Sequence, residues 1–183
     1  ISTNIAETSL TIDNIVFVID SGYNNEKVYW TNIGLESLSI RPISKASVKQ
    51  RIGRAGRIKN GKAFHLYTKN IYINLQNETT PEILRCNIIN ETLTMLSLGI
   101  NNPIKFDYID APNPSTLSRA LSILSALNAI NNKGIITNLG REIGKFPVDP
   151  RMAKCIIKSY DNDCVYETII IASMLEIKDK LFR

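Results

Sequence analysis

Five consecutive apolar residues near the start of the chain place the strongest restriction on its fold. The run at 15–19 (Ile-Val-Phe-Val-Ile) is rich in β-branched side chains, follows Asp13-Asn14 and ends at Asp20-Ser21-Gly22. A short run that is apolar at every position is typical of a strand buried on both faces of an α/β sheet. We therefore expect a buried strand at 15–19 within an α/β domain.

Two further patterns of strand residues follow. Residues 26–41 predict a β-hairpin, with arms at 27–30 and 36–40 around the turn-like Thr31-Asn32-Ile33-Gly34. A second short strand is expected at 61–67. The single histidine of the chain, His65, falls in this strand, where we expect a surface or packing residue rather than a catalytic one.

The second half of the chain contains repeated helix-start signals. Thr79-Thr80-Pro81-Glu82 combines hydroxyl caps with proline at the first helical position, and apolar residues at helical spacing continue to Gly99, which predicts one helix between them. Similar patterns predict a helix starting near Ser115 or Ser118, a short helix capped by Thr137, a helix from Asp149-Pro150, and a very apolar helix at 165–177.

The segment Gln50–Arg57 (Gln-Arg-Ile-Gly-Arg-Ala-Gly-Arg) carries the most specific functional pattern. If the segment is helical, Gln50, Arg54 and Arg57 stand at i, i+4 and i+7, so their side chains share one face. Two guanidiniums beside one amide suit a polyphosphate, because Arg offers fixed forks of donors to phosphate oxygens and Gln can hold a water molecule. A basic helix that contacts only solvent is the alternative.

The basic residues of the chain are concentrated around this segment. Residues 41–69 contain nine of the 22 Lys and Arg residues and none of the 17 Asp and Glu residues, so the net charge of +5 originates here. Such a block requires either solvent or a polyanion, for which nucleotide phosphates or an RNA backbone are suitable.

Gly53 and Gly56 lack a Cβ, so a ligand or another backbone can come close to them. Arg51 points away from the shared face.

Cysteine and histidine usage excludes several classes of site. Cys86, Cys155 and Cys164 form no CxxC pair, and His65 has no partner histidine, so a zinc site or a disulfide framework is not expected. An intracellular, reducing setting fits better. No apolar run approaches the roughly 20 residues that span a bilayer.

Short polar side chains dominate the segment Thr3–Asp13 (Thr-Asn-Ile-Ala-Glu-Thr-Ser-Leu-Thr-Ile-Asp), which suits a loop and the start of a helix. A carboxylate can accept hydrogen bonds from ribose hydroxyls, and short hydroxyls can bind phosphate or sugar oxygens. A polar turn that only caps a helix is the alternative.

Both functional segments resemble motifs of one family. Thr3–Asp13 looks like motif V, and Gln50–Arg57 looks like motif VI, of superfamily-2 helicases, in particular the DEAH-box RNA helicases of the splicing and ribosome-biogenesis type. Ile52 departs from the family pattern, in which a small residue is usual. Further matches lie at Pro42–Ser47, Pro81–Arg85 and Phe146–Pro150, so the resemblance covers nearly the whole chain.

The resemblance implies a fold class and three domains. The fold is the α/β C-terminal part of a RecA-like helicase lobe with a β-hairpin, followed by an α-rich winged-helix domain and the start of a helical bundle. The implied boundaries are 1–77 for the second RecA-like lobe, 78–146 for the winged helix and 147–183 for the start of the ratchet bundle. The chain starts abruptly inside motif V and contains no GxxxxGK[ST] loop and no Asp-Glu-Ala-His box. We therefore expect a fragment of a longer protein, inactive by itself.

The resemblance also implies the roles of the site residues. NTP would be hydrolysed between two RecA-like lobes, with Gln50 positioning the attacking water and Arg54 and Arg57 acting as arginine fingers on the γ-phosphate. The other implied site residues are Ser9, Thr11, Asp13 and Gly53 at the nucleotide, with Asp13 near the ribose, and Thr3 and Asn4 at the RNA backbone.

The implied ligands are ATP or another NTP with Mg²⁺, whose ligands lie outside this chain. The expected partners are RNA, the N-terminal RecA-like lobe of the same protein and an activating protein of the G-patch type, with no membrane. The expected location is the nucleus, with the cytoplasm as the alternative. Two other functions stay open: a non-enzymatic RNA-binding or adaptor module, and a DNA helicase of the same superfamily.

Overall fold

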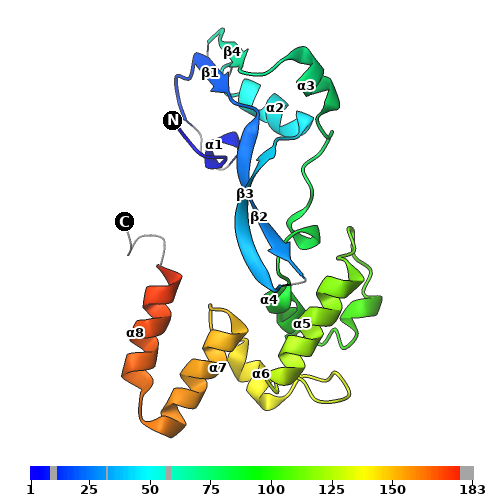
Figure 1. The fold of residues 1–183 in the computed structure, drawn as a ribbon, viewed down its shortest axis with the longest axis vertical. Coiled ribbons are helices and arrows are strands. Elements are labelled where there is room, and N and C mark those ends of the chain that lie inside the picture. The colour runs from blue at the N-terminus through cyan, green and yellow to red at the C-terminus, as the bar shows by residue number, and fades with distance from the viewer. Residues whose placement is uncertain (9–11, 32, 57–58, 178–183) are drawn as a thin grey trace. The chain divides into compact units, whose positions relative to one another are not determined.

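A computed structural model describes residues 1–8, 12–31, 33–56 and 59–177 of the chain (Figure 1). The chain divides into two compact units, residues 1–86 and residues 87–183. No helix among the described residues combines the length and the apolar character needed to cross a membrane.

The first unit contains a two-stranded parallel sheet. Strand β1 (Phe17–Asp20) pairs with β4 (Lys62–His65), in a register that runs from Phe17 opposite Lys62 to Asp20 opposite His65. Both strands were predicted, at 15–19 and 61–67. Parallel pairing brings the carboxyl ends of both strands to the same edge, where Asp20 lies.

The prediction that the first strand is buried is wrong for the described chain. Phe17 and Ile19 expose 64% and 71% of their surface, and Phe64 on the neighbouring strand is also exposed. An unbroken apolar run indicates burial on both faces only where other elements cover those faces. Among the described residues, β4 is the only strand that pairs with β1, so the apolar face is left open.

The predicted hairpin is present and longer than expected. Strand β2 (Tyr23–Trp30) pairs antiparallel with β3 (Leu35–Pro42) along its whole length. The connecting turn is closed by the amide of Gly34, which donates to the Trp30 carbonyl at 2.7 Å, and Gly34 has a φ of 70° that suits glycine.

Two helices complete the packing of the first unit. Helix α2 (Lys45–Ile52) and helix α3 (Lys69–Asn74) flank a core of Ile43, Val48 and Leu75, with Tyr67 and Tyr72 packed against it. Helix α3 was not predicted, although Thr68 supplied a signal: its hydroxyl accepts from the Ile71 amide as an N-cap. A four-residue helix α1 (Ile5–Thr8) lies near the N-terminus.

The helix predicted between Thr80 and Gly99 is divided. A 3₁₀ turn η1 (Glu82–Leu84) comes first, and helix α4 (Ile89–Ser97) begins only after Asn87. The Asn87 side chain accepts from the Ile89 amide at 3.2 Å, so a local side-chain bond replaces continuous helix between them. Gly99, with a φ of 89°, follows the end of α4 as predicted.

The second unit is mainly helical, and its predicted helix starts are confirmed. Thr137 caps one helix by accepting from Gly140 at 3.0 Å, and Asp149 caps another by accepting from Arg151 at 2.8 Å. An antiparallel bridge joins Ile130 to Ile136. The remaining elements are η2 (Pro103–Lys105), α5 (Pro114–Ala126), α6 (Asn138–Ile143), α7 (Pro150–Ser159), η3 (Tyr160–Asn162) and α8 (Val165–Glu176).

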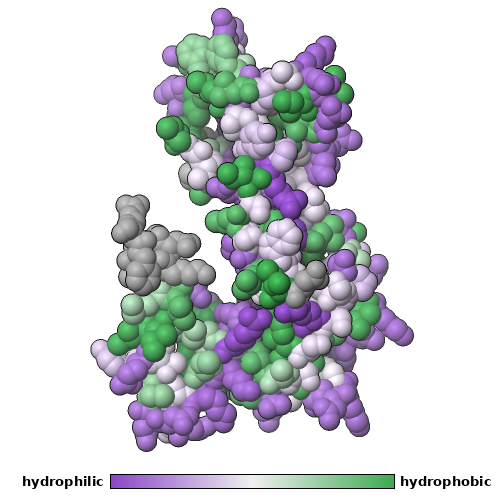
Figure 2. Space-filling model, in the orientation of Figure 1, coloured by the Kyte–Doolittle hydropathy of each residue, from purple (hydrophilic) through white to green (hydrophobic). Residues whose placement is uncertain are grey.

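The core of the second unit lies between α4 and α5, where Leu93, Leu96, Leu117 and Leu124 are buried. Helix α8 differs from its neighbours because it exposes apolar side chains, including Ile169, Ile170 and Ile171, and Figure 2 shows apolar surface over this helix. The predicted apolar helix at 165–177 is therefore confirmed, but most of its apolar surface is exposed.

Candidate functional site

The helix that carries Gln50 is capped by side chain and backbone together. The Ser44 hydroxyl accepts from the Ser47 amide at 3.1 Å, which confirms the predicted N-cap. The amides of Lys45 and Ala46 donate to the carbonyls of Gln76 and Asn77, at 2.8 and 3.0 Å. With the Val48 amide bonded to the Ser44 carbonyl, the first four N–H groups of α2 all have acceptors.

The expected continuous helix through Arg57 is wrong over its described part. Helix α2 ends at Ile52, and the Arg54 and Ala55 amides instead donate three residues back, to Arg51 and Ile52, at 3.1 and 3.0 Å. Gly53 begins this tighter turn, as its low helix propensity allows. Gln50 is therefore exposed on the last turn of α2, whereas Arg54 lies in the turn beyond the helix and is buried.

The two glycines of this turn differ in their surroundings. A Cβ added at Gly56 would meet nothing within 4 Å, so space for a close approach exists there. A Cβ at Gly53 would lie 3.3 Å from the Lys49 carbonyl oxygen, within its own helix end.

Arg54 is buried against the N-terminal segment. The residue is 8% exposed, and its Nε donates to the Glu7 carbonyl oxygen at 2.9 Å, with Nη2 donating to the same oxygen. Glu7 belongs to α1, so the contact joins the segment at 3–13 to the turn at 53–56. The predicted finger residue thus carries a structural contact in this chain, and its role at a phosphate stays a prediction.

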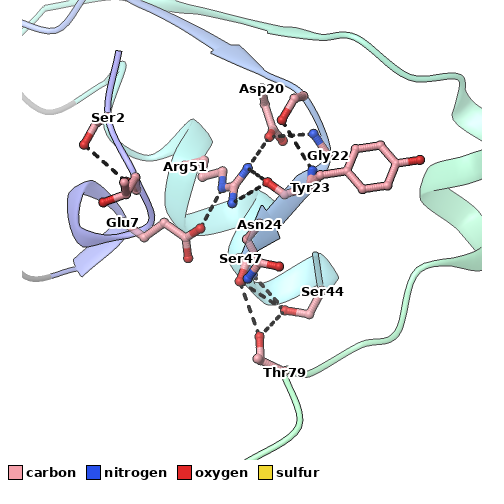
Figure 3. Close-up of polar contacts among 12 residues, drawn as sticks. Ser2, Glu7, Asp20, Gly22, Tyr23, Asn24, Ser44, Ser47, Arg51 and Thr79 are labelled. Carbon is pink, nitrogen blue, oxygen red and sulfur yellow. Dashed lines mark hydrogen bonds and ion pairs between the residues drawn. The ribbon is translucent and has the colours of Figure 1, made fainter. Parts of the chain in front are cut away.

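Arg51 makes the contacts that the sequence did not reveal. Figure 3 shows its guanidinium between Glu7, Asp20 and Tyr23: Nε donates to Glu7 Oε1 at 2.7 Å and Nη1 to Asp20 Oδ1 at 2.6 Å. Nη1 and Nη2 also donate to the Tyr23 carbonyl, at 3.3 and 3.4 Å. The prediction that Arg51 points away from the shared face is compatible with this position, but the partners were not foreseen, because they lie up to 44 residues away in sequence.

Asp20 is a buried carboxylate with several donors. In addition to Arg51, the Gly22 amide donates to it at 3.0 Å and the Tyr67 hydroxyl at 2.9 Å, while His65 Nδ1 lies 3.5 Å away. Burial alone would raise the pKa of Asp20, but the hydrogen bonds from Gly22, Arg51 and Tyr67 and the Arg51 charge hold it below its ordinary value of 3.8. Burial, and then the bond to Asp20, raises the pKa of Tyr67.

The other predicted site residues fall into two groups. Thr3, Asn4 and Asp13 are exposed, and the carbonyls of Thr3 and Asn4 accept the amides of Ala6 and Glu7 at the start of α1. Ser9, Thr11 and Arg57 lie outside the described residues. Through the contacts of Glu7, helix α1 thus lies beside the turn that follows α2.

Neither a cluster of metal-ligating side chains nor the main described cavity includes these residues in the part of the chain that the structure describes. The described part of the chain contains no cluster of three or more metal-ligating side chains, and the Asp20 oxygens are already occupied by protein donors, so the residues present do not fit Mg²⁺. A cavity of about 500 Å³ lies between the root of the hairpin and α3, and its lining includes Glu26, Arg41 and Asn70 but none of the predicted site residues.

Comparison with known proteins identifies the family. Three protein-family models match successive parts of the chain: the helicase conserved C-terminal domain at residues 1–59, the winged-helix part of the helicase associated domain at 120–148, and its ratchet-like part at 149–183. A crystal structure of the Escherichia coli DEAH/RHA helicase HrpB is 30% identical with a TM-score of 0.90, and covers 100% of this chain. The chain belongs to the DEAH-box helicase family.

A second structure of this helicase family agrees. The E. coli DExH-box NTPase HrpB is 31% identical over 95% of the chain, with a TM-score of 0.82. The chain covers only 21% and 23% of the two matched HrpB chains. The predicted fold class is confirmed: an α/β helicase region with a hairpin comes first, followed by the winged-helix and ratchet parts of a DEAH-box helicase.

Proposed function

We propose that this chain is part of an NTP-driven DEAH-box RNA helicase, in which NTP hydrolysis drives movement along RNA and the remodelling of RNA or RNA–protein complexes. The observation that carries the proposal is the contact of the motif V segment with motif VI through Glu7, Arg51 and Arg54. In an NTPase, segments that both act on one nucleotide must be held side by side.

The proposed catalytic groups are those of motif VI. Gln50, exposed at the end of α2, positions the attacking water, and Arg54 and Arg57 stabilise the charge that develops on the γ-phosphate. For Arg54 this role requires its guanidinium to approach the phosphate from its place beside the Glu7 carbonyl. Mg²⁺, held by residues outside this chain, would neutralise charge on the phosphates.

The proposed binding groups are those of motif V and the turn. Asp13, exposed before β1, accepts from the ribose, and Gly53 leaves the backbone close to the nucleotide; the other members of this group are Ser9 and Thr11. Thr3 and Asn4, both exposed, contact the RNA phosphates.

Arg54→Ala in the complete protein tests the mechanism. Because a missing finger leaves transition-state charge without its donor, we expect kcat for ATP to fall by about 10³, with ATP still bound. Lys49→Ala, on the exposed side of the same helix, is the matched control and should retain turnover. Hydrolysis by Arg54→Ala at a near-normal rate would contradict the finger assignment.

The same assay separates the alternatives. Stimulation of ATP turnover by RNA but not by DNA supports an RNA helicase, and the reverse supports a DNA helicase. We expect no turnover from residues 1–183 alone, because motifs for phosphate and Mg²⁺ binding are absent from the sequence. Turnover by this chain alone would contradict that part of the proposal.

The biological setting rests on the resemblance alone. Splicing or ribosome biogenesis, a nuclear location and a G-patch type partner stay predictions, and both matched structures come from a bacterium.

A further inference from the structure

Arg51 joins the N-terminal helix α1 to the end of β1 and the start of the hairpin, which lie 28 to 44 residues away from it in the sequence. Glu7 is in the motif V helix, Asp20 ends β1, and Tyr23 is the first residue of the hairpin. One guanidinium holds all three, at donor–acceptor distances from 2.6 to 3.4 Å (Figure 3). The contact therefore runs from a nucleotide-contacting motif to the root of the hairpin.

The chemistry of the contact requires arginine. The planar guanidinium presents donors in fixed directions, whereas a lysine ammonium is a single point of charge on a flexible stem. The side chains of Arg51 and Glu7 are only 16% and 12% exposed, and that of Asp20 is fully buried. The charges are thus shielded from solvent, and the geometry of the contact is held more firmly than at a surface pair.

The same contact separates Arg51 from the proposed catalytic groups. Each of its three guanidinium nitrogens already donates to Glu7, Asp20 or the Tyr23 carbonyl. Gln50, its neighbour, is exposed instead. Of these two consecutive residues of α2, Gln50 is thus available to the proposed reaction site, whereas Arg51 is held by contacts within the protein.

We propose that Arg51 is a positioning residue that links the motif V helix to the root of the hairpin, so that movement of motif V on nucleotide binding is passed to β2 and β3. The inference rests on the proposed function, since it takes motif V as a segment that responds to bound nucleotide. Glu7 and Asp20 are the two anionic ends of the link.

Amide hydrogen exchange in the complete protein tests the link directly. We expect a nonhydrolysable ATP analogue to change exchange in both residues 1–8 and residues 23–42 of the unaltered protein. In Arg51→Lys, residues 1–8 should still respond, while the response of residues 23–42 falls by about threefold or more, because the fork that joins them is gone. An undiminished hairpin response in this variant would overturn the inference.

A second variant covers the case in which Arg51→Lys does not fold. Glu7→Ala removes only the motif V end of the link and leaves Arg51 paired with Asp20, and the hairpin response should again be lost. Lys49→Gln is the control of similar position and should respond fully. A full hairpin response in Glu7→Ala would overturn the inference, and no response anywhere in the unaltered protein would overturn the proposed function as well.

Steady-state kinetics distinguish positioning from a general structural defect. In Arg51→Lys and Glu7→Ala we expect the KM for ATP to stay within about twofold, while RNA-stimulated kcat falls about tenfold. A higher KM with kcat retained would overturn the assignment, because it would show that the link serves nucleotide binding and not the transmission of movement.

Discussion

At the residue scale, Gly61 determines how closely the chain entering β4 passes the turn at 53–56 within motif VI. A Cβ at this position would lie 1.7 Å from the Ala55 carbonyl oxygen and 2.6 Å from the Val16 carbonyl oxygen. Both neighbours are backbone, so neither can rotate away.

We therefore expect Gly61→Ala to destabilise the complete protein by about 1–3 kcal/mol, measured by urea denaturation. Gly56→Ala is the matched control: its Cβ meets nothing within 4 Å, and its stability should change by no more than about 0.5–1 kcal/mol in either direction. Equal stability of the two variants would contradict the close approach at Gly61.

Asp20 makes a pH-dependent contribution to stability. Its pKa in the folded protein is lowered, so the carboxylate stabilises the fold at pH values above its unfolded pKa of about 3.8, and this contribution is lost as the pH falls through the folded pKa. Asp20→Asn removes the charge but keeps the shape, and it leaves Arg51 with one carboxylate fewer.

At pH 7 we expect Asp20→Asn to cost on the order of 3 kcal/mol, because it breaks a buried pair. The difference from the unaltered protein should narrow as the pH falls below about 4. Denaturant unfolding of both proteins between pH 7 and pH 3 measures it, with the exposed Asp110→Asn as control. A difference that does not change with pH would show that the lost hydrogen-bond acceptor, and not the charge, accounts for the effect at Asp20.

The individual site residues were only partly predictable from sequence. The cap at Ser44 and the exposure of Gln50 follow from local patterns. The burial of Arg54 and the partners of Arg51 do not, because both depend on Glu7, which is brought close only by the tertiary fold. A helical wheel also assumes an unbroken helix, and Gly53 ends α2 before Arg54 is reached.

At the element scale, Arg85 holds the outer edge of the hairpin from outside it. Arg85 Nη1 donates to the Lys27 carbonyl at 2.9 Å, and the Tyr29 amide donates to the Arg85 carbonyl at 2.7 Å, along the outer edge of β2. Arg85 Nε also donates to the Thr80 carbonyl at 3.2 Å, which anchors the segment that follows the lobe. The edge of β2 is therefore paired where Arg85 reaches it.

Arg85→Met should loosen this edge while leaving the strand pairing of β2 with β3 in place. We expect amide exchange at residues 27–30 to become about tenfold faster, since a charge-assisted bond contributes about 1.5–3 kcal/mol. Lys27→Ala is the control, because Lys27 contributes its carbonyl and its side chain is exposed. Unchanged exchange in Arg85→Met would contradict an anchoring role.

Elements with local signals were the easiest to predict. The hairpin, β4, α6, α7 and α8 all follow from turn residues, caps or apolar periodicity. The division between η1 and α4 was missed because the apolar spacing continues across it, while the break depends on the local bond between Asn87 and the Ile89 amide.

At the scale of the whole molecule, the order of parts was predictable because the two motifs and the helix-start signals are local. The exposure of β1 was not. A single sequence indicates that Phe17 and Ile19 need covering, but it does not show which element would cover them.

The capping of α2 by residues 76 and 77 has a practical consequence for dividing the protein. A truncation after residue 75 would remove the carbonyls to which the Lys45 and Ala46 amides donate, and would leave the start of the Gln50 helix without those acceptors. An expression boundary after residue 86 keeps both carbonyls and the Arg85 anchor in the same piece. The segment that follows the lobe in sequence therefore also contributes to the stability of the lobe.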